Sequence, residues 1–174
     1  MRPAAIACII LLIVAAVLWC AVWFVLYPDM ARAATLGEVR MLVAVNAERE
    51  KRGQVPLRFR TSLLEAGRYH AKDMARRNLL THISSNGWTV GQRLRAFGYT
   101  STGTIYYKIG ECIGRGYAGT IWKTPEGMVA LWMGSSTHRA IILTSSFRDF
   151  GCGMRWNYWT TWRYFTADFG RRVY

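Results

Sequence analysis

The stretch DFGCGMRWNYWTTWRYFTADFG, residues 149–170, decides the fold that we predict for this chain. Its two halves are rich in aromatic residues and alternate along the chain, which predicts strands at about Asp149–Trp156 and Trp159–Asp168 with Asn157 and Tyr158 at the turn. Alternation divides the aromatic side chains between the two faces of the hairpin. We favour core packing on both faces. An exposed aromatic face that holds an apolar ligand, a glycan or a protein partner is the alternative.

Helical patterns dominate the chain before this hairpin. Helices followed by strands predict an α+β fold, layered as an α-β-α sandwich. We expect a helix over 37–52, a second helix that begins at a Ser62–Glu65 capping box, and a third that runs from a Thr89–Gln92 capping box to Gly98. A strand follows over Ile105–Ile113. A fourth helix is capped by Thr124, has Pro125 at its first position and ends near Met133.

The N-terminal segment Ala4–Tyr27 is apolar and contains no charge over its 24 residues. A helix needs about 20 such residues to span a bilayer, and the basic end at Arg2 favours a cytoplasmic N-terminus. We therefore predict one transmembrane signal anchor and a cell-membrane location with the rest of the chain on the extracytoplasmic side. A signal peptide cleaved near Ala33, giving a secreted protein, is the alternative, but its apolar region is usually about 7–15 residues. The expected divisions are 1–3 cytoplasmic, 4–27 spanning, 28–36 linker and 37–174 domain.

The chain is strongly basic, with a formal net charge of +13. Residues after Ala33 keep a net charge of +12, which draws a domain toward anionic lipid or an anionic cell-envelope polymer. A solvated basic surface without a fixed partner is equally open. Nucleic acid is not an expected partner, because no nucleic-acid-binding motif is visible and export removes the domain from the genome.

Glu111 is the acidic residue that falls in the interior of a predicted strand rather than at its end. An unpaired carboxylate is costly to bury, so Glu111 needs a partner. The three histidines of the chain, His70, His82 and His138, are candidates for it.

Seven short motifs resemble, in order and spacing, the bacterial form of the CAP superfamily, also called the SCP domain, over about residues 38–170. The motifs are Leu42-x-x-x-Asn46-x-x-Arg49, His70-x-x-Asp73-Met74, Thr81-His82, Gly110-Glu111, Trp132-Met133-x-Ser135-Ser136-x-His138-Arg139-x-x-Ile142-Leu143, Phe150-Gly151-x-Gly153 and Thr166-x-Asp168-Phe169-Gly170.

The resemblance implies a cleft over the sheet in which many members hold two histidines and two glutamates, with an associated divalent metal. His82 and His138 match the two cleft histidines and Glu111 matches one glutamate, so these three are the candidate ligands for Zn²⁺ or another divalent metal. His70 matches a helix histidine common in bacterial members and is given a structural, supporting role. The second glutamate has no clear match; Glu126 is the nearest acid.

Cys112 occupies the position where the family usually has asparagine after the glutamate. Cys152 lies in the Phe150-Gly151-x-Gly153 motif, whose strand could lie beside that of Glu111. An oxidising compartment permits these two residues to pair, so we predict a Cys112–Cys152 disulfide.

The resemblance implies a secreted binding or signalling module. Together with the predicted anchor, it leads us to favour a membrane-tethered binding or interaction module over an enzyme. The first alternative is a metal-assisted hydrolase at the cell envelope with Glu111 as general base. The second is an accessory single-span subunit of a membrane protein complex with a vestigial cleft. Asn46, Arg49 and Asp73 are expected to hold helices together.

Overall fold

The hairpin predicted near the C-terminus is the centre of the sheet in the computed structural model, which describes residues 33–174. Within that range four strands lie in the order β1-β3-β4-β2, with β1 parallel to β3 and the other neighbours antiparallel. The strands are β1 (Arg58–Phe59), β2 (Tyr106–Tyr117), β3 (Asp149–Asn157) and β4 (Trp162–Val173).

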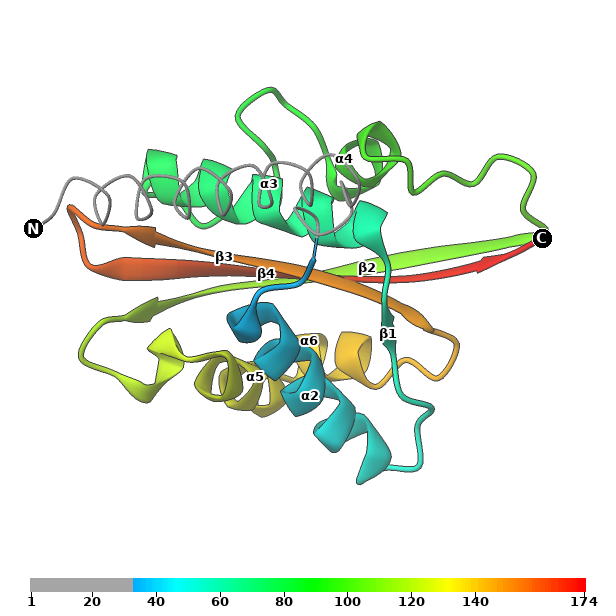
Figure 1. Cartoon of the computed structure of the whole chain (residues 1–174), viewed down its shortest axis with the longest axis horizontal. Coiled ribbons are helices and arrows are strands. Elements are labelled where there is room, and N and C mark those ends of the chain that lie inside the picture. The colour runs from blue at the N-terminus through cyan, green and yellow to red at the C-terminus, as the bar shows by residue number, and fades with distance from the viewer. Residues whose placement is uncertain (1–32) are drawn as a thin grey trace, which may run out of the picture. The chain divides into compact units, whose positions relative to one another are not determined.

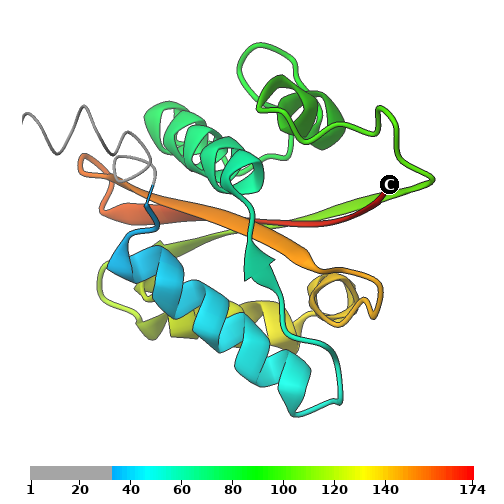
Figure 2. The same cartoon turned by 45° about the vertical axis from the view of Figure 1, so that its right-hand side comes forward.

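Helices cover both faces of this sheet, which confirms the α+β layering (Figures 1 and 2). On one face lie α3 (Thr61–Arg77) and α4 (Val90–Ala96); on the other lie α2 (Leu36–Glu50), α5 (Pro125–Gly134) and α6 (Ser136–Ile142), and the short 3₁₀ helix η2 (Ile121–Lys123) precedes α5. Apolar clusters fill the space between each helical layer and the sheet.

Two glycines of the Phe150-Gly151-x-Gly153 motif allow α3 to lie directly on β3. A Cβ atom at Gly151 would lie 2.1 Å from the backbone carbon of Leu63, and one at Gly153 would lie 2.3 Å from the carbonyl oxygen of Gly67. Such distances are far below van der Waals contact, so any side chain here would push the helix off the sheet. The motif therefore sets the spacing between α3 and the strand that it covers.

Local signals predicted helix starts with mixed success. The Thr89–Gln92 capping box and the Thr124 cap are present as predicted. The Ser62–Glu65 box is wrong: α3 begins at Thr61 after Arg60, whose side chain makes no cap, and the Ser62 hydroxyl is buried without a hydrogen-bond partner. Ser62 lies inside the first turn, so its hydroxyl is not at the capping position.

The predicted Cys112–Cys152 disulfide is wrong, because both cysteines are free and buried. Each pairs in register with Ala167 of β4, so β4 lies between their strands. Two strand spacings separate the Cα atoms by about 9–10 Å, whereas a disulfide needs less than about 7 Å. Burial raises the pKa of both thiols, which keeps them protonated.

The predicted membrane span, Ala4–Tyr27, lies outside the described residues. Within residues 33–174, no helix has both the length and the apolar character required to span a bilayer. Residues 34–174 form one compact unit, close to the predicted domain boundaries of 37–174.

Candidate functional site

The α3–α4 face of the sheet holds a buried polar cluster around Glu111. Glu111 projects from β2 and is 5% exposed. His82, in the loop between α3 and α4, places Nδ1 2.6 Å from Glu111 Oε1, and Arg93 of α4 donates from its guanidinium to Oε2. The prediction that an imidazole pairs with this carboxylate holds for His82. Arg93 is a second partner, which the motifs did not reveal.

Arg93 is fully buried and connects Glu111 to the rest of the cluster. Its guanidinium also donates to the carbonyl of His82 at 3.2 Å and to the hydroxyl of Ser84 at 3.0 Å. Burial alone would raise the pKa of Glu111, but the His82 hydrogen bond and the Arg93 charge outweigh it and hold that pKa below its usual range. Glu111 is therefore an anion with both oxygens occupied by donors.

His70 lies beneath this group on α3 and completes a chain of hydrogen bonds. Its Nε2 lies 2.8 Å from the Thr81 carbonyl oxygen, which only accepts, so Nε2 carries the proton. Its Nδ1 then accepts from the Ser84 hydroxyl at 3.2 Å, and Ser84 in turn accepts from Arg93. This geometry supports the structural role predicted for His70.

His138 lies apart from these direct contacts. Its Nδ1 is 2.9 Å from the Ser135 hydroxyl, and its ring centroid is 6.5 Å from that of Trp132. Burial and then the charge of His82 lower its pKa, so the two histidines are close enough to interact electrostatically. Asp168 of β4 is the register partner of Glu111 on β2. Glu126, the acid that the sequence offered for the unmatched second glutamate, instead pairs with Arg40 at 2.7 Å.

Asp168 is a buried acid beside Glu111 whose role the sequence did not indicate. It is fully buried, and among the described residues neither carboxyl oxygen has a donor. Burial and the neighbouring Glu111 carboxylate raise its pKa well above the usual range, although Arg93 opposes this. Asp168 is therefore favoured in its protonated, neutral form. Asp168 points to the face of the sheet opposite that of Ala167 and Phe169, and in an α-β-α sandwich that face is covered by helices too.

This arrangement does not fit the zinc hypothesis. His82 Nδ1 contacts one oxygen of Glu111 and Arg93 contacts the other, so these three groups are directed at each other. Residues 33–174 contain no group of three or more histidine, cysteine, aspartate or glutamate side chains placed to hold a metal ion. An open zinc site needs three such ligands around one point.

Stability should depend on pH through His70. Burial lowers its pKa from 6.5 to about 4. A neutral buried histidine contributes its full stabilisation above the unfolded-state pKa of 6.5 and loses it as the pH falls toward 4. We expect the free energy of unfolding to drop by about 3 kcal/mol across this window. Urea unfolding of wild type and His70→Gln at pH 7 and pH 4.5 measures it: the variant should lack most of the drop. A His70 ring that titrates near 6.5 by NMR would contradict the assignment.

Comparison with known proteins identifies the family. The model of the CAP family, described as the cysteine-rich secretory protein family, matches residues 42–169. The Bacillus subtilis protein YkwD is 33% identical over 116 residues, which is 67% of this chain and 41% of that protein. This chain therefore belongs to the CAP family, as the motifs predicted.

Solved structures agree on the fold. An outer surface protein of Borrelia burgdorferi superimposes with a TM-score of 0.63 at 17% identity, over 76% of this chain and 90% of that one. An extracellular SCP-domain protein of Bacillus anthracis gives a TM-score of 0.60 at 23% identity, over 78% of this chain and 40% of that one. These likenesses establish the architecture only.

Proposed function

We propose that this protein is a membrane-tethered CAP-domain binding module on the extracytoplasmic side of the cell membrane. The observation that carries the proposal is the enclosure of Glu111. Its carboxylate is 5% exposed, both of its oxygens accept from His82 and Arg93, and its lowered pKa makes it a weak base, so it is poorly suited to take a proton from water. The cluster fixes the His82 loop and α4 against the sheet, as a satisfied buried network does.

The tether rests on the apolar run Ala4–Tyr27, which is long enough for one span. The basic side of the run, at Arg2, favours the orientation that places the domain outside. The net charge of +12 that follows Ala33 suits a partner at an anionic surface.

Two measurements test this function. The full chain should stay in the membrane pellet after alkaline carbonate extraction, with residues 1–27 still present by mass spectrometry. It should also show no turnover of casein or p-nitrophenyl acetate above buffer, with zinc or with chelator. A mature N-terminus near Ala34 would overturn the tether. Zinc-dependent turnover that is lost in His82→Ala, a half-exposed position, would overturn the binding function in favour of a hydrolase.

A further inference from the structure

The turn between β3 and β4, residues 157–161, exposes two large aromatic side chains. Tyr158 is 78% exposed and Trp159 is 97% exposed. The sequence placed Trp159 within a strand, but β4 begins at Trp162, so both side chains leave the sheet at its end. We call residues 157–161 the hairpin tip. Exposed aromatics of this size in a small loop favour a role in contact with another surface.

The hairpin tip is held in place although its aromatic side chains are free. The side-chain amide of Asn157 donates to the Ala75 carbonyl at the end of α3 at 2.9 Å. Its Oδ1 accepts from the backbone amides of Trp159 at 3.0 Å and Thr160 at 3.2 Å. The Thr160 hydroxyl lies 3.2 Å from Asn78 Oδ1. Presenting these aromatics therefore requires no ordering of the loop on binding.

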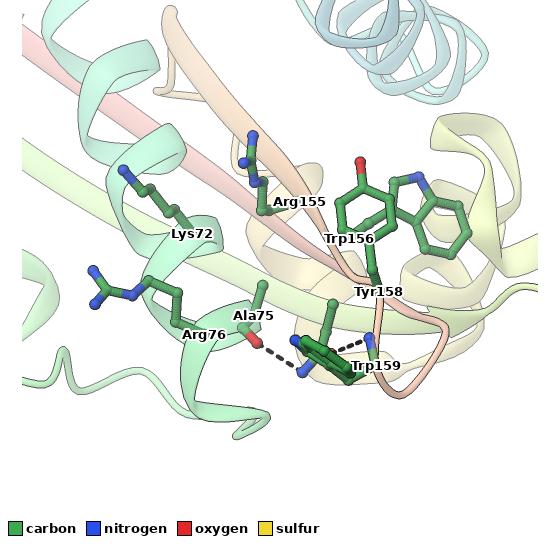
Figure 3. Close-up of a pocket in the computed structure, with 8 residues that line it drawn as sticks. Lys72, Ala75, Arg76, Arg155, Trp156, Tyr158 and Trp159 are labelled. Carbon is green, nitrogen blue, oxygen red and sulfur yellow. Dashed lines mark hydrogen bonds between the residues drawn. The ribbon is translucent and has the colours of Figure 1, made fainter.

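Cations surround an open pocket of about 360 Å³ beside the hairpin tip. In Figure 3, Lys72 and Arg76 extend from α3 on one side, while Tyr158 and Trp159 extend from the hairpin on the other. Arg155 and Trp156 of β3 complete the charged and aromatic lining, and no acidic residue lines the pocket. The three cations are exposed, so each is available to an anion from outside.

A second group of exposed apolar side chains lies at the same end of the sheet. Tyr117, the last residue of β2, pairs with Trp162, and the Ala118 amide donates to the Thr161 carbonyl at 3.0 Å. The segment that follows exposes 71% of Ile121 and 42% of Trp122. Aromatic and basic side chains from two connections are thus gathered at one end of the domain.

We propose that this end of the domain docks on the surface of an anionic phospholipid bilayer, with Tyr158 and Trp159 at the headgroup level and Lys72, Arg76 and Arg155 on lipid phosphates. Tryptophan and tyrosine prefer that depth because one end of each ring system is apolar and the other is polar. Basic residues near an anionic leaflet each strengthen binding by about fivefold. A hydrated anionic polymer would bind the cations, but it offers no apolar layer for the two protruding rings.

The point at which the chain enters α2 supports the same surface, and this step rests on the proposed function. At most eight residues, 28–35, separate the proposed span from α2, and fully extended they reach about 28 Å. The first turn of α2 lies at the hairpin end of the sheet, because a Cβ at Gly37 would lie 2.9 Å from Met154 Sδ and 3.7 Å from the Arg163 guanidinium. Arg163 pairs with Trp156 in the sheet. The chain therefore enters the domain at the end that carries the aromatics.

The test uses the full chain in nanodiscs of brominated phosphatidylcholine, with and without phosphatidylglycerol. Subtracting the emission of Trp159→Phe from that of wild type isolates Trp159. We expect this difference signal to be blue-shifted and quenched when phosphatidylglycerol is present. Arg76→Glu with Arg155→Glu should abolish the quenching. Arg95→Glu with Arg139→Glu changes the net charge equally at exposed positions on α4 and α6 and should leave it intact.

Several outcomes would overturn the docking proposal. One is a Trp159 signal that is unquenched in both lipid compositions; another is equal loss in the two charge-reversed variants. Binding to soluble dextran sulfate without quenching by lipid would assign the surface to a polyanion instead. If the chain is not retained in nanodiscs, the tether fails, and the same difference signal measured with added vesicles still decides the docking.

Discussion

Replacing Arg49 with methionine should lower the free energy of unfolding by about 3–5 kcal/mol. The side chain is fully buried on α2 and donates to four backbone carbonyls, and no acid within residues 33–174 is among its partners. The accepting carbonyls belong to Val55, Ile142, Thr144 and Phe147, at 3.0, 2.6, 3.0 and 3.4 Å. Methionine fills the volume but leaves those oxygens unsatisfied, and each bond to a charged donor contributes on the order of 1 kcal/mol or more.

Urea unfolding of matched variants measures this loss. Arg49→Lys should retain only part of the stability, because one ammonium cannot reach acceptors in several directions. Arg52→Met is the control three residues later on the same segment, since Arg52 is exposed and pairs only with Glu48 among the described contacts. A loss below 1 kcal/mol in Arg49→Met would show that water replaces the guanidinium.

The motifs found Arg49 because its position follows from the family pattern, but they could not show what it contacts. The carbonyls that it binds come from the turn before β1, and from the last residue of α6 and the segment after it, nearly 100 residues away. The role expected for it, holding elements together, agrees with these contacts. Asn46 likewise joins α2 to Leu57 through a pair of bonds at 3.0 and 2.8 Å.

Local signals predicted most helices and strands, whereas neighbours in the sheet needed the structure. Nothing local to Cys112 and Cys152 indicates that β4 lies between their strands, so the disulfide prediction failed. The second strand was predicted to begin at Trp159 because aromatic residues continue through the turn; Asn157 instead organises a longer loop and leaves Trp159 in solvent. Helix α6 was missed because it is short and carries few buried residues.

The site shows the same limit. His82 and Glu111 were predicted to meet, and they do. Arg93 and Arg95 are both arginines on the same short helix, yet Arg93 is fully buried and Arg95 is exposed. The available signal was helical spacing, because Arg93 shares the inward stripe of α4 with Val90 and Leu94. A buried arginine on that stripe needs hydrogen-bond acceptors, which an acid on the facing strand can supply.

The Arg93–Glu111 pair should show the strongest coupling in the domain. Arg93→Met would leave Glu111 buried beside the Asp168 carboxyl with His82 as its remaining donor, and we expect a loss of about 3–5 kcal/mol. Glu111→Gln would leave the buried guanidinium with neutral acceptors alone, and should also be destabilising. The double variant removes both charges, so it should lose less than the sum of the single variants.

A double-mutant cycle from urea unfolding at pH 7 measures this coupling, with Arg95→Met as an exposed control on the same helix. We expect a coupling of about 2–3 kcal/mol. The pH dependence supplies an independent check, because Glu111 has a lowered folded pKa: its contribution is present above the unfolded pKa of 4.5 and is lost as the pH falls through the folded value. The part of the unfolding free energy that is lost at low pH should therefore be smaller in Arg93→Met. If the losses of the two single variants instead add up to that of the double variant, and the low-pH loss is unchanged in Arg93→Met, Glu111 is stabilised by His82 alone.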